Sequence, residues 1–95
     1  MMNKYETIII INPNIEEDGI KKLIQKFSDL INKNGKVESV EEMGKKRLAY
    51  LIKKQKEGFY VLINFEAETN SITELERVYG ITDEVLKFIV IKKEV

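Results

Sequence analysis

The sequence contains neither cysteine nor histidine. Without thiol groups there are no disulfide bonds and no thiolate metal sites, and nothing requires an oxidising compartment. The usual general base and the usual activated nucleophiles are also missing, and no glycine-rich phosphate loop is present. We therefore expect a cytoplasmic protein that is not an enzyme, with no metal and no cofactor.

Long hydrophobic runs are missing as well. The apolar run Ile8-Ile9-Ile10-Ile11 is far shorter than the roughly 20 residues of a membrane helix, and no signal-peptide pattern precedes it. The sequence thus predicts no membrane contact.

The chain has a single proline, and 43% of its 95 residues are hydrophobic, which is typical of a folded chain rather than a disordered one. A chain of this length buries about two thirds of its unfolded surface around one core. We expect one domain spanning residues 1–95.

Positive charge is concentrated in one segment. The chain has 16 basic and 16 acidic residues, yet residues 44–56 contain six basic residues and no acidic one. These are Lys45, Lys46, Arg47, Lys53, Lys54 and Lys56. Clustered lysine and arginine bind phosphate backbones through counterion release, whatever the net charge of the protein. We expect an RNA-binding surface here, extended by Lys92 and Lys93; the alternative is a solvated hairpin whose lysines prevent edge-to-edge aggregation.

Hydrophobic periodicity predicts six elements. They are a strand at 5–11, a helix between Asn14 and Gly35, a strand at 36–52, a strand at 59–67, a helix between Thr69 and Gly80, and a strand at 85–91. This order, βαββαβ, is the α+β ferredoxin-like arrangement, in which right-handed crossovers place both helices on one face of a four-stranded antiparallel sheet.

Local signals suggest how these elements end. Asn14, three residues before Glu17, predicts a helix N-cap, and Asn34-Gly35 predicts a left-handed helix stop. Gly44 predicts a β-bulge, and residues 55–58 predict the turn between the second and third strands.

One face of the sheet is left without helices, although alternate strand residues on both faces are apolar. The residues expected on the open face are Ile8, Ile10, Tyr60, Leu62, Ile89 and Ile91. A contiguous exposed apolar patch of this kind marks a protein or ligand interface. We expect a partner protein there; the alternative is that rim side chains, or the extension of the second and third strands, cover the patch.

Two further interpretations remain open. Tyr50, within the basic segment, either stacks on a nucleobase or packs at the rim of the core. The whole chain could instead be a regulatory domain of ferredoxin-like fold that binds a small molecule or dimerises through its sheet, but such a domain would not need the basic segment.

Several motifs resemble those of one known family, along nearly the whole chain. They are Tyr5-Glu6, Asn12-Pro13-Asn14, Val40-Glu41-Glu42-Met43-Gly44, Arg47-Leu48-Ala49-Tyr50, Lys54, Gly58 and Val90 to Lys92. The sequence is similar to the bacterial small-subunit ribosomal protein six family. The resemblance implies a ferredoxin-like constituent of the small ribosomal subunit that binds the central domain of the ribosomal RNA together with small-subunit ribosomal protein eighteen.

Two features depart from that family. Leu51 stands where members usually have proline, and the longer charged C-terminal tail of many members is absent. From the first we expect a less rigid turn, and because of the second we do not carry the family's tail-mediated contacts over to this chain.

Overall fold

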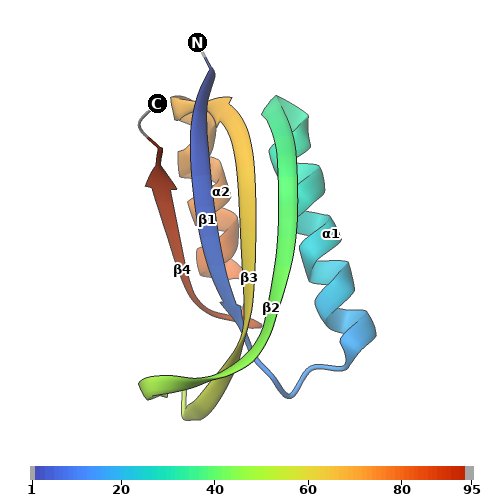
Figure 1. Ribbon diagram of the computed structural model, residues 1–95, viewed down its shortest axis with the longest axis vertical. Coiled ribbons are helices and arrows are strands. Elements are labelled where there is room, and N and C mark those ends of the chain that lie inside the picture. Colours follow the sequence, from blue (N-terminus) through green and yellow to red (C-terminus); the bar gives the residue numbers. More distant parts are fainter. Residues whose placement is uncertain (1, 94–95) are drawn as a thin grey trace.

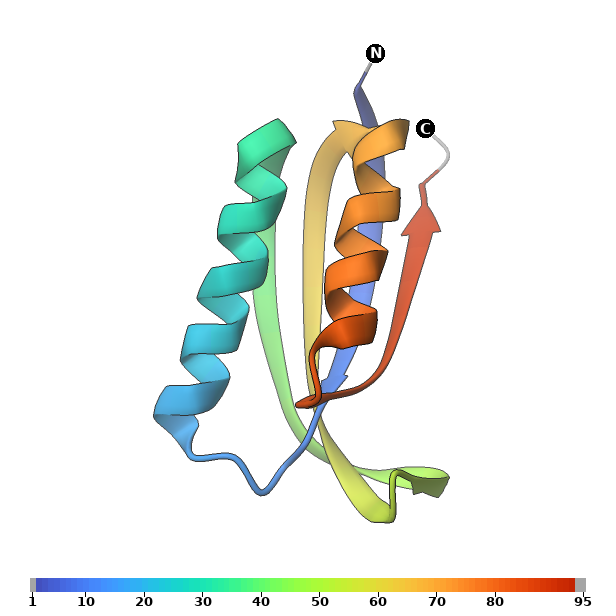
Figure 2. The same ribbon diagram turned by 180° about the vertical axis from the view of Figure 1, so that it is seen from behind.

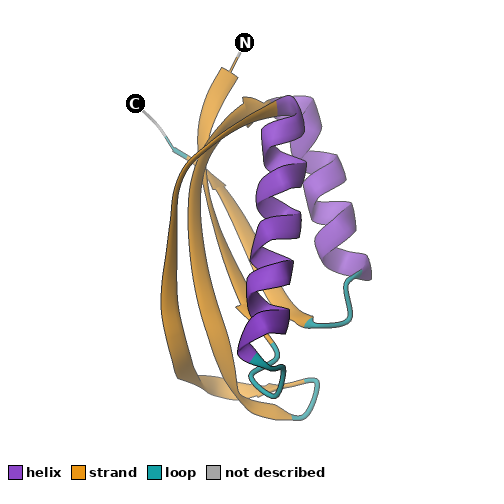
Figure 3. Cartoon of the chain, turned by 90° about the vertical axis from the view of Figure 1, so that its right-hand side faces the viewer, coloured by secondary structure: helices purple, strands orange, loops and turns teal. Residues whose placement is uncertain are grey.

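The computed structural model describes residues 2–93 and has the predicted order of elements. The elements are β1 (Met2–Ile11), α1 (Glu17–Asn34), β2 (Gly35–Ile52), β3 (Gln55–Glu68), α2 (Thr69–Ile81) and β4 (Val85–Lys92). The strands form one sheet in the order β2-β3-β1-β4, and all neighbouring strands are antiparallel. Both helices cover the same face of the sheet, so the other face has no helix over it (Figures 1 and 3).

The core lies between the sheet and the helices. Alternate residues of β1 and β3, among them Ile9 and Ile63, are fully buried on this side, as periodicity two requires. Phe27 of α1 and Tyr79 of α2 meet above them with ring centroids 4.8 Å apart in an edge-to-face arrangement. The only buried polar side chain of the strands among residues 2–93 is Thr7, whose hydroxyl donates to the Ile89 carbonyl over 2.9 Å.

The end of the β2–β3 hairpin extends past the end of β1 and bends toward the start of β4 (Figures 1 and 2). We call residues 45–58 the arm. The bend follows register shifts in β2, one of them between Glu42 and Gly44, where Gly44 has a φ of 85°. The predicted bulge at Gly44 is confirmed, and a left-handed residue there favours glycine.

A second, small apolar cluster holds the arm against the rest of the sheet. Leu48 of the arm packs with Ile10 of β1 and Leu86 of β4, and these three side chains are buried. At the tip, the Lys53 ammonium donates to the Val85 carbonyl over 3.1 Å. The arm is therefore a folded part of the molecule rather than a free loop.

The turn between β2 and β3 lies earlier than predicted. It consists of Lys53 and Lys54, with φ values of 49° and 67°, between the paired residues Ile52 and Gln55. The prediction of a turn at 55–58 is wrong, because Gly58 is paired with Lys46 inside the β2–β3 ladder. A Cβ at position 58 would lie 2.3 Å from Ile10 Cγ2. Glycine at 58 permits the close approach of β3 to Ile10.

α1 ends at Asn34 as predicted, but the predicted N-cap of α1, the left-handed conformation of Gly35 and the stop of α2 at Gly80 are wrong. The N-cap of α1 is Glu16, without a side-chain capping bond, because the Asn12 side chain binds the Asn14 amide in a local turn. Gly35 is extended, with a φ of −170°, and a Cβ there would meet the Glu66 carbonyl at 2.1 Å. α2 continues past Gly80 to Ile81, and the Thr82 hydroxyl then donates to the Val78 carbonyl.

Candidate nucleic-acid interface on the arm

All six basic side chains of the 44–56 segment are exposed on the arm. Three of them, Lys45, Lys54 and Lys56, line one hollow together with Pro13 and Asn14 of the β1–α1 connection. One acid, Glu57, also lines this hollow. Three lysines of the arm thus lie beside a loop that is far away in the sequence.

The Asn14 side chain forms one wall of this hollow, where its amide donates to Gln55 Oε1 over 3.1 Å. Sequence reasoning missed both residues as part of the surface. No local signal could have found them, because 41 positions separate them and only the bend of the arm brings them together.

A second hollow lies on the arm itself. Arg47 and Lys56 line it together with the apolar side chains of Leu48, Tyr50 and Leu51. Tyr50 and Leu51 are 61% and 59% exposed, so two cationic groups here border an exposed apolar surface. This combination suits a ligand that has both phosphates and flat rings.

The cationic groups of the arm are not neutralised by fixed acids. The ion pairs within residues 2–93 involve Lys4, Lys21 and Arg77, and none involves a basic residue of the arm. Lys46 Nζ lies 5.9 Å from the centroid of the Tyr60 ring, which is a cation–π contact. The arm therefore keeps its positive charge available to an external anion.

Tyr50 contacts β4 rather than the core. Its hydroxyl accepts a hydrogen bond of 2.9 Å from Lys87, whose ammonium lies 5.5 Å from the ring centroid. The bond to Tyr50 raises the pKa of Lys87. Tyr50 thus links the arm to β4, and most of its ring remains exposed.

Lys92 and Lys93 do not extend the cluster on the arm. In the pairing register Lys92 lies level with Tyr5, whereas Lys45 lies level with Phe59 and hence with Ile11. Six residues of strand separate these levels, which is about 20 Å. The prediction of one continuous basic track is therefore wrong, because β4 runs away from the arm.

The open face of the sheet is only partly exposed. Of the six residues predicted there, Ile10 is buried beneath the arm, while Ile8, Tyr60 and Leu62 are half-buried. Ile89 and Ile91 of β4 are 44% and 47% exposed. The arm therefore covers the end of the predicted patch at Ile10 and leaves Ile89 and Ile91 of β4 exposed.

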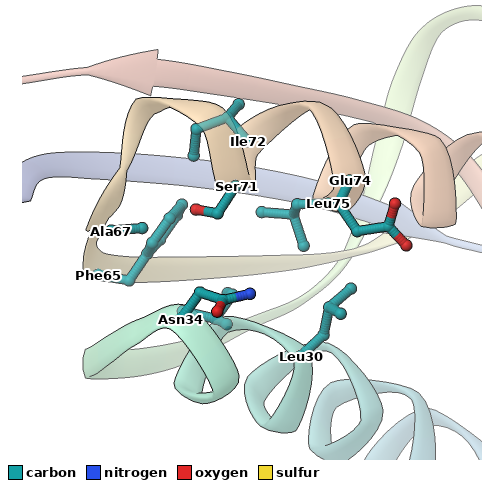
Figure 4. Close-up of a pocket in the computed structure, with 9 residues that line it drawn as sticks. Leu30, Asn34, Phe65, Ala67, Ser71, Ile72, Glu74 and Leu75 are labelled. Carbon is teal, nitrogen blue, oxygen red and sulfur yellow. The ribbon is translucent and has the colours of Figure 1, made fainter.

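A small pocket between the end of α1 and the start of α2 is mostly apolar (Figure 4). Its one acidic side chain, Glu74, accepts hydrogen bonds of 2.5 and 3.0 Å from Arg77, which lower the pKa of Glu74. Within residues 2–93 there is no group of three acidic side chains placed to hold a metal ion. No helix in this part of the chain is long and apolar enough to cross a membrane.

The fold and the surfaces together define a class of protein: a ferredoxin-like α+β domain that presents a basic arm and a half-open sheet. The sequence model of ribosomal protein S6 matches residues 4–92, and the chain belongs to this family. The family is structural and non-enzymatic, and its members are small ribosomal subunit proteins of the cytoplasmic ribosome.

Individual relatives agree with this assignment. The chain is 48% identical to the small ribosomal subunit protein bS6 of Clostridium perfringens over 94 residues, which cover 98% of this chain and 99% of the relative. It is 46% identical to the protein of the same name from Clostridium botulinum, over 98% and 100% of the two chains. The crystal structure of 30S ribosomal protein S6 from Thermotoga maritima has a TM-score of 0.92 and 33% identity, covering 98% of this chain and 89% of that one.

Proposed function

We propose that the chain, folded as a single domain over residues 1–95, binds the central domain of the small-subunit ribosomal RNA together with small-subunit ribosomal protein eighteen. The observation that carries the RNA-binding part is the arm, which exposes six basic side chains that are free of the ion pairs found within residues 2–93. The family resemblance supplies the identity of the RNA and of the protein partner.

The two hollows suggest a division of labour on the arm. Lys45, Lys54 and Lys56 act as point charges on phosphates that pass beside the β1–α1 loop. Arg47, on the other hollow, donates two parallel hydrogen bonds to one phosphate, and the exposed Tyr50 ring offers a surface to an unpaired base. The mechanism is binding, with no chemical step.

The protein partner contacts the part of the sheet that the arm leaves open. Ile89 and Ile91 are exposed there, and Leu62 is half-buried two strands away. Removing this apolar surface from water supplies affinity, while the neighbouring arm engages the RNA. The two surfaces adjoin, because the arm itself packs against the start of β4.

The RNA-binding proposal is tested with two triple variants of equal charge change. One removes the cations of the hollow (Lys45→Ala, Lys54→Ala, Lys56→Ala), and the control removes three exposed cations of α1 (Lys22→Ala, Lys26→Ala, Lys33→Ala). Affinity for a fragment of the central domain, with the partner protein present, is measured at several salt concentrations. We expect the arm variant to lose up to about 0.9 from the log–log salt slope for each lost phosphate contact, and the α1 variant to keep its slope.

The comparison between the two variants shows whether the arm is the RNA-binding surface. If both lose affinity equally, the effect comes from net charge alone and the arm is not the binding surface. If neither changes, the phosphate contacts assigned to the arm do not exist.

A further inference from the structure

β4 is the outermost strand on one side of the sheet. Lys93 N–H donates to the Lys4 carbonyl over 2.8 Å, and the Ile89 carbonyl accepts from the Thr7 hydroxyl of β1. Because antiparallel strands alternate the direction of their backbone groups, Ile89 and Ile91 also point their backbone groups at β1. Phe88, Val90 and Lys92 therefore point theirs outward, where within residues 2–93 no strand accepts them.

The two edges of this sheet differ in protection. β2, at the other edge, has register shifts at three places and carries charged residues of both signs. Charges and bulges of this kind prevent another strand from pairing with an edge. β4 keeps an unbroken register with β1 from Lys87 to Lys92, and the residues between these two lysines are all apolar.

We propose that the outer edge of β4 accepts an extended segment of a protein partner as a fifth strand of the sheet. The recognition is by backbone hydrogen bonds to Phe88, Val90 and Lys92, the mode known as β-augmentation. The partner's side chains on the open face then lie beside Ile89 and Ile91, which are close to half exposed.

Charge indicates the chemistry of the segment. Residues 85–93 contain Lys87, Lys92 and Lys93 and no acid. Lys87 donates to the Tyr50 hydroxyl and Lys93 to the Asn64 side-chain carbonyl, so neither is neutralised by these contacts. A segment with apolar residues at its centre and acidic residues toward its ends is complementary to this edge.

A second copy of the chain does not suit the same edge. Antiparallel pairing of two β4 strands about a two-fold axis at Val90 pairs the outward-facing Phe88 and Lys92 and places Lys87 of each copy opposite Lys93 of the other, and like charges directly opposite are destabilising. Every such pairing also brings six lysines together along one seam, since each edge carries three. The charges of β4 thus favour a foreign strand over self-association.

A pair of variants at one position separates backbone pairing from charge. Lys92→Pro removes an outward N–H while every hydrogen bond to β1 is kept, and Lys92→Thr removes the same charge but keeps the N–H. Both variants should have nearly the same stability in the free protein, which denaturation checks. Incorporation into small ribosomal subunits, in competition with the parent chain, should fall at least tenfold for Lys92→Pro relative to Lys92→Thr.

Hydrogen exchange gives the second measurement. The 15N-labelled chain, free or assembled into small subunits, is exchanged in D2O, quenched, dissociated and measured by NMR. The amides of Phe88, Val90 and Lys92 should exchange at least tenfold more slowly in the subunit. The amides of Ile89 and Ile91, already bonded to β1, should change less.

This inference rests on the proposed protein-docking role of the open sheet, and the outcomes distinguish the two. A third variant, Leu62→Lys, places a charge on the helix-free face and so tests face docking. Unchanged edge amides, with Lys92→Pro incorporated normally and Leu62→Lys excluded from subunits, overturn strand addition and leave face docking intact. If Lys92→Pro, Lys92→Thr and Leu62→Lys all assemble normally, both strand addition and face docking are wrong. Edge protection that ribonuclease abolishes means that RNA covers β4, and protection that rises with the concentration of the free chain means self-pairing; either result overturns the inference.

Discussion

Single residues in this molecule are fixed by contacts that the local sequence does not display. Asn14 has the sequence position of a helix cap, yet it binds Gln55 of the arm instead. Gly58 has the sequence context of a turn, yet it lies within β3 against Ile10. In both cases a long-range neighbour outweighs the local propensity, and that neighbour is unknown until the arm has been placed.

The close approach at Gly58 leads to a stability prediction. A methyl group at this position would lie 2.3 Å from Ile10 Cγ2 in the small cluster beneath the arm, so the arm must shift outward. We expect Gly58→Ala to lower the free energy of unfolding by about 1–3 kcal/mol in chemical denaturation. The control is Gly80→Ala, where nothing lies within 4 Å; it should raise the free energy of unfolding by about 0.5–1 kcal/mol. Equal effects at both positions would contradict the tight packing under the arm.

Tyr79 makes a pH-dependence prediction. Burial raises the pKa of the Tyr79 hydroxyl well above its usual range. Above a pH of about 10 the unfolded chain loses this proton while the folded chain keeps it, so this group lowers the free energy of unfolding by about 1.4 kcal/mol per pH unit. Below pH about 10 the Tyr79 hydroxyl is protonated in both the folded and the unfolded chain, so it causes no loss of stability there. Denaturation at pH 10 to 12 should therefore show a shallower decline for Tyr79→Phe than for the parent, since lysine titration is common to both; parallel declines would contradict the assignment.

At the scale of elements, periodicity predicted all six helices and strands, because the two helices and β1, β3 and β4 have buried apolar stripes and the apolar residues of β2 lack a helical period. The β2–β3 turn was the exception. A two-residue turn with positive φ at both positions favours Asn-Gly, and two lysines give no such signal. The chain instead has two charged residues in left-handed conformations at the end of its basic arm.

The two lysines of the turn therefore add positive charge to the arm but adopt backbone conformations that lower stability. Lys54 has a φ of 67°, which costs about 1–2 kcal/mol for a residue with a side chain. We expect Lys54→Gly to raise the free energy of unfolding by about 1 kcal/mol and to weaken RNA binding through the lost charge. The control, Lys56→Gly in β3, should weaken RNA binding similarly but lower stability by about 0.5–1 kcal/mol. Denaturation and filter binding measure both quantities, and lower stability for Lys54→Gly would contradict the proposed strain.

At the scale of the whole molecule, the sequence predicted that the basic residues of the arm form one surface but could not predict which other charged residues lie near them. Lys45 to Lys56 are gathered by one hairpin, so a local run was sufficient. The place of Lys92 depends on the direction and register of β4, which no local pattern gives. The burial of Ile10 likewise depends on the bend of the arm. Fold class was thus predictable from periodicity, and the limits of the two surfaces were not.

The open sheet gives a prediction at this same scale. Leu62 is half-buried on the helix-free face, so Leu62→Lys should leave the free protein folded and reduce its association with the partner protein at least tenfold. Thr73→Lys, on the exposed side of α2, adds the same charge and should have no effect. Circular dichroism checks folding, and co-purification of the two proteins checks association. Loss of the fold in Leu62→Lys would place this residue in the core.

The position of β1 has a consequence for the synthesis of this chain. β1 is translated first, yet it pairs with β3 on one side and β4 on the other, so both of its neighbours are made later. Until residues 85–92 leave the exit tunnel, the nascent chain holds a strand of four isoleucines with one unpaired edge. A component of the translation machinery thus passes through its own most aggregation-prone state while another ribosome is still making it.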